Sequence, residues 1–433
     1  MRLDWRSSVT MAPGSRCSCV SSPDRLLLKA IAAHQAGRIN EACALYERRL
    51  RGRPGDPDTL NFLGMLEFQR GAPGRGIELL RKSLKNDPDN PHAWMNLGNM
   101  LMGVGNAEGA LDAFERATDL APDLWQAWMN LAICFRRLRR IEDAVACLRT
   151  TIRLKPDHDL AYERLGTILY RAGKSEDLAE LYRNWVKNDP ENPLARHLYA
   201  AAAGAAAPDR ASDEYLRISF DRFADAYDDN LRDLAYRAPQ LLVDALERHQ
   251  RLPAGHSRPD ILDAGAGTGL CGLLLRARAG TLLGVDLSPG MLAKARERRV
   301  YDELVVMELC EFMRGRPSSF DIVVSADTLV YFGALEEALR AAGTCLREGG
   351  LLAFTVERWV TDDAAAQFRL GIHGRYMHAA RYVEGVLNAS GYAAREVLPV
   401  VLRSELGTDV PGLVVVARLA ARPSSSESAT ATG

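Results

Sequence analysis

The sequence of 433 residues has no excess of either charge and no long apolar run. Its 55 Lys and Arg residues nearly balance 56 Asp and Glu residues, which leaves a formal net charge of −1. Because a near-neutral chain has no broad basic field, we expect no binding to nucleic acid or to an anionic membrane. No apolar run approaches the roughly 20 residues that would span a bilayer. We therefore expect a cytoplasmic protein, with two or more domains because the chain is too long for one ordinary core.

Cysteines are few and are not spaced as metal ligands. The eight cysteines include one close pair, Cys17 and Cys19, and the others are scattered through apolar patterns. This distribution predicts reduced, buried thiols and no metal site. Residues 1–22 carry charges and have no continuous apolar core, which predicts a disordered arm and no secretory signal. The Ser- and Thr-rich residues 422–433 are also predicted to be disordered.

The first half of the chain contains a proline period. Prolines recur every 34 residues, at positions 54, 88, 122, 156 and 190. One copy places Trp94, Leu97 and Gly98 on a first helix and Ala110 and Phe114 on a second. Large residues on each helix pack against small residues on the other, and the proline ends the second helix. A period of this length predicts a solenoid of helix pairs.

This pattern resembles the tetratricopeptide repeat and predicts an all-α solenoid of about five repeats over residues 23–198. The resemblance implies a groove that binds a peptide or a partner protein. The alternative is an array that serves only as a scaffold or an assembly surface. An Ala-rich stretch, residues 199–212, is interrupted by Gly204 and Pro208 and is predicted to be a linker.

The second half, residues 213–421, alternates predicted strands with predicted helices, as a doubly wound α/β domain does. Strands are predicted at 261–264, 281–286, 304–308, 320–325, 350–356, 396–402 and 412–418. Helices are predicted at 269–277, 290–298, 334–346 and 381–390. No helix separates the last two strands, so we predict a seven-stranded, mixed, Rossmann-like sheet with an antiparallel C-terminal edge.

Three alternating glycines follow the first predicted strand. At Gly265, Gly267 and Gly269 the absence of a Cβ permits a tight turn and close approach of a ligand to the main chain. The second predicted strand ends at Asp286. In a nucleotide-binding βαβ unit, an acidic residue at this position accepts hydrogen bonds from the ribose hydroxyls. Asp263 lies just before the glycines, and a carboxylate there repels a pyrophosphate and attracts a cation.

Together these residues resemble the cofactor loop of class I S-adenosylmethionine-dependent methyltransferases. The resemblance implies S-adenosyl-L-methionine as the cofactor, with the glycine loop around its methionine half. It places Asp263 toward the ammonium group, Asp286 on both ribose hydroxyls and Leu287 against the adenine.

The same resemblance implies further cofactor contacts at the ends of the next strands. Glu308 and Leu309 are expected near the adenine, and Ser325 near the sulfonium. A helical segment before the first strand has aromatic residues at helical spacing and ends at Tyr227, which is expected to cover the cofactor.

The acceptor of the methyl group is not evident from the sequence. Methyl transfer by in-line displacement depends on positioning, and no triad or carboxylate pair is present. Candidates for the acceptor side are Tyr331, His373, Tyr376 and His378. The layout resembles predicted bacterial methyltransferases that contain tetratricopeptide repeats, and it implies that the repeats recruit a protein substrate. The alternatives are a small-molecule or carrier-protein methyltransferase whose repeats serve assembly, and a non-enzymatic adaptor with a cofactor-sensing domain.

Overall fold

The computed structural model describes residues 25–204, 207–249 and 258–420. The segments predicted to be disordered, 1–22 and 422–433, lie outside these residues. The chain divides into two compact units between Ala172 and Gly173. Within the described ranges, no helix has both the length and the apolar character needed to cross a membrane.

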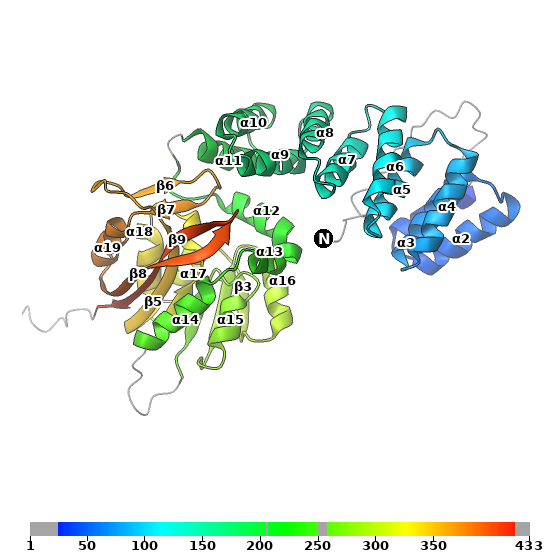
Figure 1. Ribbon diagram of the computed structural model, residues 1–433. Coiled ribbons are helices and arrows are strands. Elements are labelled where there is room, and N and C mark those ends of the chain that lie inside the picture. The colour runs from blue at the N-terminus through cyan, green and yellow to red at the C-terminus, as the bar shows by residue number, and fades with distance from the viewer. Residues whose placement is uncertain (1–24, 205–206, 250–257, 421–433) are drawn as a thin grey trace, which may run out of the picture. The chain divides into compact units, whose positions relative to one another are not determined.

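The first unit is built from helices that follow one another in pairs (Figure 1). Over residues 25–172 these are α1 (Arg25–Gln35), α2 (Ile39–Gly52), α3 (Pro57–Gln69), α4 (Pro73–Asn86), α5 (Pro91–Gly103), α6 (Ala107–Leu120), α7 (Trp125–Arg137), α8 (Ile141–Leu154) and α9 (Asp159–Arg171). The closest packing is within successive pairs, α1 with α2, α3 with α4, α5 with α6 and α7 with α8, and each pair also contacts the next. This arrangement confirms the predicted all-α repeat region.

The repeated residues have the packing roles that the sequence predicts. A Cβ on Gly98 would lie 2.5 Å from the Phe114 ring, so the glycine is what allows α5 and α6 to approach closely. The indole N–H of Trp94 donates a hydrogen bond of 2.8 Å to the carbonyl of Pro88. One repeat later, Trp128 donates to the carbonyl of Pro122 at 2.9 Å. The tryptophan of one repeat is therefore tied to the proline that ends the repeat before it.

The second unit begins with helices that the sequence assigns partly to the repeats. These are α10 (Ser175–Asn188), α11 (Pro193–Ala203), α12 (Asp213–Phe223), α13 (Tyr227–Asp233) and α14 (Ala238–His249). His197 on α11 stacks on Tyr215 of α12 at 4.0 Å between ring centroids, and its Nε2 donates to the Gly374 carbonyl at 2.8 Å. The compact unit therefore includes the end of the predicted array, 23–198.

Part of the predicted linker, 199–212, is joined to the sheet domain. Its first residues complete α11, and Gly204 follows with a left-handed φ of 59°. Further along, the Asp209 carbonyl accepts hydrogen bonds from the N–H groups of Gly333 and Ala334, at 2.7 and 2.9 Å. The N–H of Ala211 donates to the Tyr331 carbonyl at 2.9 Å. This end of the segment is thus held by hydrogen bonds.

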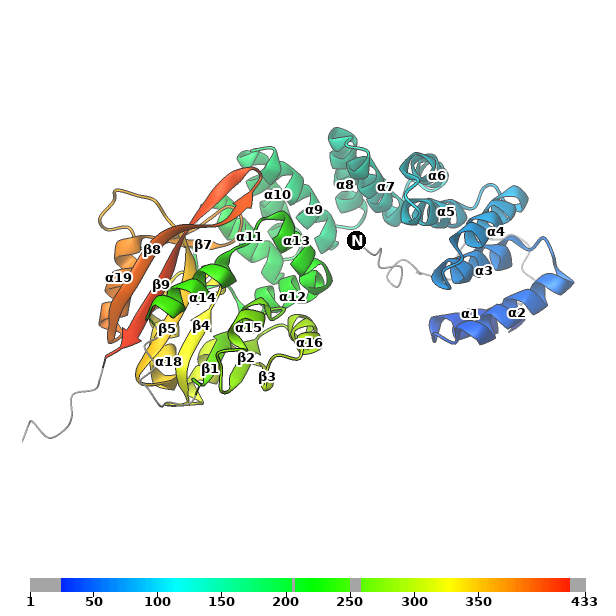
Figure 2. The same ribbon diagram turned by 60° about the horizontal axis from the view of Figure 1, so that its bottom comes forward.

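All seven predicted strands are present, and two short strands are added to them. The strands are β1 (Ile261–Ala264), β2 (Leu282–Asp286), β3 (Glu303–Val306), β4 (Phe320–Ser325), β5 (Leu346–Arg358), β6 (Phe368–Leu370), β7 (Tyr376–His378), β8 (Tyr392–Glu405) and β9 (Thr408–Leu419). Strands β3, β2, β1, β4 and β5 are parallel in that order, and β9 is antiparallel to both β5 and β8. Figure 2 shows the long β8–β9 hairpin beside β5. The mixed sheet with its antiparallel edge is confirmed.

The added strands β6 and β7 form a hairpin, and β7 pairs with the end of β5 at Glu357 and Arg358. The remaining helices are α15 (Leu270–Leu275), α16 (Pro289–Arg298), α17 (Leu309–Arg314), α18 (Glu336–Cys345) and α19 (Ala380–Ala389). Successive strand residues point to opposite faces: Ile261 packs in the core with α14 and α15, and Leu262 in the core with α17, α18 and α19. Both faces are covered, so the carboxyl ends of the strands are where a ligand can enter.

Candidate functional site

The glycine turn after β1 is shaped by one crowded position and one open position. Gly265 has a φ of 84°, and a Cβ there would lie 2.0 Å from the hydroxyl oxygen of Thr328. Gly267 has a φ of 53°, and a Cβ there would meet no atom within 4 Å. Gly265 is therefore required by the fold itself, whereas Gly267 leaves the main chain open to a ligand. Gly269 precedes α15 in the left-handed conformation.

The carboxylate of Asp286, at the end of β2, holds this turn in place. It accepts a hydrogen bond of 2.9 Å from the N–H of Gly267 and another of 2.9 Å from the N–H of Ser288. Burial raises the pKa of Asp286, and the backbone N–H groups of Ser288 and Gly267 oppose that shift. Each carboxylate oxygen can accept more than one hydrogen bond, so the group can still take a ribose hydroxyl.

Asp263, the last but one residue of β1, lies beneath the turn. Its side chain is buried, and its Oδ2 accepts a hydrogen bond of 2.6 Å from the hydroxyl of Tyr301. Burial raises the pKa of Asp263 to about 7, Tyr301 lowers it, and the nearby Asp286 raises it further. A buried carboxylate with so high a pKa gains most from a cationic ligand.

A pocket forms above the turn, and the predicted residues Tyr227, Asp263, Gly265 and Gly267 line it. The other lining residues are Leu231, Tyr236, Pro239, Ala266, Thr268, Leu270, Cys271 and Ala326. The lining contains an acidic side chain and no Lys or Arg. A phosphate group would find no cation among these lining residues, whereas a positively charged group would find the carboxylate of Asp263.

Two aspartates connect the helices before β1 to the segments that follow β1 and β2. Asp221 on α12 accepts a hydrogen bond of 2.9 Å from the N–H of Gly290, at the start of α16. Asp228 on α13 accepts one of 2.6 Å from the Thr268 hydroxyl, in the glycine turn. Between them, Tyr227 packs edge-on against Phe220 at 6.2 Å between ring centroids. The segment thus lies where the resemblance places a cover.

The other predicted cofactor residues are placed around the same edge of the sheet. Leu287 follows Asp286 directly after β2, and Ser325 ends β4 with its hydroxyl donating to the Ala264 carbonyl at 2.8 Å. Glu308 lies two residues beyond β3, accepts the Glu311 N–H at 2.7 Å, and pairs with Arg210 at 3.0 Å. Leu309 begins α17 and is buried. Glu308 therefore already has two donors.

Two of the four acceptor-side candidates lie deep in the fold. Tyr376 is fully buried and donates its hydroxyl to the Pro208 carbonyl at 2.6 Å. His378 is also fully buried, and its Nε2 donates to the Phe332 and Gly333 carbonyls, at 2.9 and 3.1 Å. Burial lowers the pKa of His378 to about 4. These contacts hold the β6–β7 hairpin, so we do not propose either residue as a group that touches the acceptor.

His373 lies beside Glu357 near the end of β5, and Tyr331 ends a short helical turn, Leu329–Tyr331, that follows β4. The Nδ1 of His373 accepts the Arg375 N–H at 3.2 Å, and its Nε2 lies 3.3 Å from Glu357. Burial, with Arg375 close by, lowers the pKa of His373 to about 4. Tyr331 packs edge-on against Phe220 at 5.4 Å between ring centroids. Phe220 thus contacts both Tyr331 and the pocket residue Tyr227.

A buried network of ion pairs lies at this end of the sheet, and it was not predicted from the sequence. Arg403 on β8 pairs with Asp327 at 2.6 Å, with Glu405 at 2.7 Å and with Glu357. Arg375 pairs with Glu357 and Glu405, each at 2.6 Å. The side chains of Arg403 and Glu357 are only 3% and 2% exposed. The signal for it in the sequence is the presence of Glu357 and Arg403 inside the otherwise apolar strands β5 and β8.

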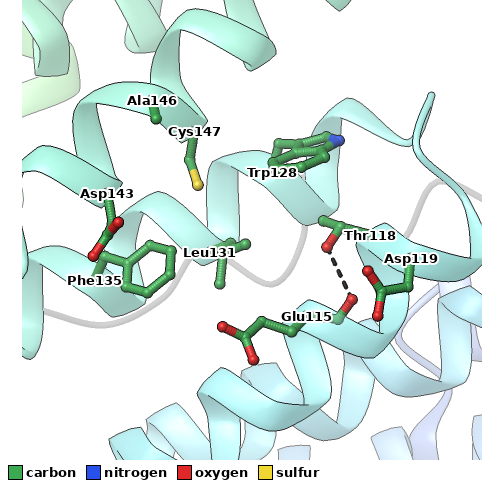
Figure 3. A pocket seen from close by; sticks show the side chains of 9 residues that line it. All are labelled: Glu115, Thr118, Asp119, Trp128, Leu131, Phe135, Asp143, Ala146 and Cys147. Atoms are coloured by element: carbon green, nitrogen blue, oxygen red, sulfur yellow. Dashed lines mark hydrogen bonds between the residues drawn. The ribbon is translucent and has the colours of Figure 1, made fainter.

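A second pocket lies on the repeats, between α6, α7 and α8, with a volume of about 360 Å³. Figure 3 shows the rings of Trp128 and Phe135 on α7 and the carboxylates of Glu115, Asp119 and Asp143 around them. Asp143 pairs with Arg140 at 2.7 Å. Among the described residues, no ion-pair partner is found for Glu115 or Asp119. The guanidinium of Arg140 also lies over the Phe135 ring, 4.4 Å from its centroid. The pocket therefore combines aromatic rings with a negative charge that Arg140 compensates only in part.

Two family models match separate parts of the chain, and the repeat match extends past the boundary at Ala172 into the second compact unit. Residues 27–91, 62–124, 95–145 and 135–193 match the family described as tetratricopeptide repeat. Residues 262–354 match the family described as methyltransferase domain. The chain joins tetratricopeptide repeats to a methyltransferase domain.

Individual proteins resemble the methyltransferase domain. The chain is 40% identical over 112 residues to human methyltransferase-like protein 27, which covers 25% of this chain and 45% of the relative. It is 34% identical over 165 residues to a malonyl-[acyl-carrier protein] O-methyltransferase from Geobacter sulfurreducens, covering 36% of this chain and 59% of that one. The chain thus spans about half the length of these curated relatives. A solved S-adenosylmethionine dependent methyltransferase from Mesorhizobium loti is 23% identical, with a TM-score of 0.32, covering 40% of this chain and 96% of that one.

Proposed function

We propose that the protein is an S-adenosyl-L-methionine-dependent methyltransferase whose repeats bring a protein substrate to the methyltransferase domain. The observation that carries the proposal is the pocket over the glycine turn, which has an acidic side chain and no basic one. This lining suits a cofactor that has a ribose, an adenine and a cationic amino acid part, and it disfavours a pyrophosphate.

The residues of the pocket have distinct roles in this proposal. Bound S-adenosyl-L-methionine supplies a methyl group that is activated by a sulfonium. Asp263 faces its ammonium, and the gain in charge pairing offsets the cost of ionising a carboxylate whose pKa is about 7. Asp286 holds the turn and accepts the ribose hydroxyls, with Leu287 beside the adenine. Tyr227 covers the pocket and excludes water, while Gly267 leaves space for the methionine part.

The repeats are proposed to bind the partner through the pocket between α6 and α8. Charge complementarity favours a peptide with a Lys or Arg side chain, because Glu115 and Asp119 are negative and Trp128 offers an aromatic face. A variant with Glu115→Gln and Asp119→Asn should lose this partner. Glu142→Gln, which removes a charge from α8 outside the pocket, is the matched control.

The alternative is a carrier-protein or small-molecule methyltransferase. The similarity to the Geobacter relative, a malonyl-[acyl-carrier protein] O-methyltransferase, favours it. Labelled cofactor distinguishes the two functions. The full-length protein and the Glu115/Asp119 variant are incubated with tritiated S-adenosyl-L-methionine and a lysate of the source cell. Label in a protein band that fades with the variant supports recruitment. Label in a small-molecule or carrier fraction that is equal for both proteins supports the alternative, and no label in any fraction supports an adaptor without enzymatic activity.

A further inference from the structure

Asp327 stands out because one of its carboxylate oxygens is buried and unused. Its Oδ2 accepts a hydrogen bond of 2.6 Å from Arg403. Within the part of the chain that the structure describes, its Oδ1 has no hydrogen-bond partner, although the atom is covered by protein. An unsatisfied buried carboxylate oxygen is costly, so Oδ1 requires a donor from outside these residues, and a bound substrate can supply one.

The main chain holds Asp327 in a strained conformation. Its φ is 55°, in the left-handed region that non-glycine residues rarely adopt. Its N–H donates to the hydroxyl of Thr355 at 2.8 Å, which fixes this conformation from the neighbouring strand β5. Strain of this kind is concentrated at functional sites, where the surrounding structure enforces it.

The position of Asp327 relates it to the cofactor pocket. It follows Ala326, which lines that pocket, beyond the carboxyl end of β4. Its charge interacts with the hydroxyls of Tyr227 and Tyr236, which also line the pocket, and with that of Tyr331. The free oxygen is therefore part of the same edge of the sheet as the cofactor pocket.

The charges around Asp327 do not suit an anion. Asp327, Glu357 and Glu405 supply three carboxylates, against the two guanidinium groups of Arg375 and Arg403. Both arginines are already paired within this group, so neither is free to hold a substrate carboxylate. A group that brings its own N–H or O–H to Oδ1 would satisfy the remaining acceptor.

We propose that Asp327 determines which methyl acceptor the domain takes, and that the acceptor is a neutral nitrogen or oxygen nucleophile with an N–H or O–H group rather than a carboxylate. This inference rests on the proposed cofactor. In it, Asp327 Oδ1 accepts a hydrogen bond from the nucleophile, and Arg403 orients the carboxylate through Oδ2. As the bond from the nucleophile to the methyl carbon forms, the bond from that carbon to the sulfonium breaks and leaves S-adenosylhomocysteine, and the N–H or O–H proton passes to Asp327.

Two cofactor analogues test the inference without knowledge of the acceptor. S-adenosylhomocysteine lacks the methyl group, whereas sinefungin has a carbon with an ammonium group in place of the methyl-bearing sulfur. An ammonium at that point offers N–H donors and a positive charge to Asp327. Calorimetry on the full-length protein should show sinefungin binding roughly tenfold or more tightly than S-adenosylhomocysteine. Equal affinities in the wild type would overturn the inference, and this comparison requires no variant to fold.

Variants then assign the preference to one oxygen. Asp327→Asn, which has nearly the same shape, should reduce the preference to within about threefold while S-adenosylhomocysteine binds as before. Glu405→Gln changes a carboxylate of the same network that is already bonded to both arginines, and it should keep the preference. A preference that survives in Asp327→Asn would refute the role of Asp327. Failure of both ligands to bind the wild type would refute the proposed cofactor as well.

The chemistry of the product tests the acceptor class. A methylated carboxylate is an ester, which mild alkali hydrolyses to volatile methanol, whereas methylated nitrogen and ether oxygen survive. Tritium transferred from labelled S-adenosyl-L-methionine to material in a lysate should remain after alkali treatment. Release of the label as methanol would contradict the inferred class and leave the methyltransferase activity itself established.

Discussion

Replacing Asp286 with Ala should both loosen the glycine turn and weaken cofactor binding. The substitution removes the acceptor of two backbone hydrogen bonds, from Gly267 and Ser288, each 2.9 Å long. A hydrogen bond to a charged group contributes about 1.5–3 kcal/mol. Burial raises the pKa of Asp286, so desolvation offsets part of this gain. We expect a net loss of about 2–4 kcal/mol in the free energy of unfolding.

The affinity for the cofactor should fall by a similar amount. Two ribose hydroxyls lose a charged acceptor, which corresponds to roughly a 30-fold to 1,000-fold increase in Kd. Asp286→Asn keeps one neutral oxygen acceptor, so it should recover part of the stability and little of the affinity. The assay combines thermal unfolding of the full-length protein with calorimetric titration of S-adenosylhomocysteine.

Asp302, which immediately precedes β3, provides a matched control because it contacts the opposite end of β2. It accepts a hydrogen bond from the N–H of Leu282 at 2.7 Å and pairs with Arg276 at 2.7 Å. Asp302→Ala should lower the melting temperature and leave the affinity for S-adenosylhomocysteine unchanged. If Asp286→Ala instead melts and binds as the wild type does, Asp286 has neither of the roles assigned to it here.

Three further predictions concern pH, the turn and the boundary of the domain. Because the folded-state pKa of Asp263 is raised to about 7, the stability of the unliganded protein should fall as pH rises from 5 to 8. The affinity for S-adenosylhomocysteine should rise over the same pH interval, because binding releases a proton from Asp263. Calorimetry in buffers of different ionisation enthalpy detects that proton. Asp263→Asn should abolish both pH trends. Gly265→Ala should lower the melting temperature strongly, because the added Cβ would collide with Thr328. Gly267→Val should chiefly abolish ligand binding, because a Cβ at Gly267 meets no protein atom. Equal losses of stability in the two variants would contradict this difference. Deleting residues 1–172 should leave the Kd for S-adenosylhomocysteine within about threefold of the full-length value. Deleting residues 1–199 should in addition lower the melting temperature, because it removes His197. Identical melting temperatures for the two fragments would contradict the packing of α11.

Features of local sequence pattern were predictable. The proline period and the pairing of Gly98 with Phe114 report contacts within one repeat, and the structure confirms the repeat region. The seven predicted strands could be found because they are apolar at successive positions. In β1, for example, Ile261 and Leu262 point to opposite faces of the sheet and both are buried. Whether Asp263, Asp286 and the glycines bind a cofactor stays a proposal, although Gly267 and Asp286 are in direct contact.

Features that depend on distant residues were not predictable. Strands β6 and β7 have three residues each, which is too short for a period to show. The ion network joins Asp327 to Arg403, which is far away in the sequence, and each alone resembles a solvated surface residue. His378 could not be distinguished from a histidine at the site, because its partners are main-chain carbonyls of residues 332 and 333.

The central claim is that the pocket over the glycine turn binds a cationic adenosyl cofactor. Calorimetric titration of the full-length protein with S-adenosylhomocysteine and, separately, with NAD tests it most directly. We predict that S-adenosylhomocysteine binds with a Kd in the micromolar range, which corresponds to a binding free energy of about −8 kcal/mol. Gly267→Val should abolish this binding, and NAD should not bind. Binding of NAD, or no binding of S-adenosylhomocysteine by the folded protein, would contradict the account.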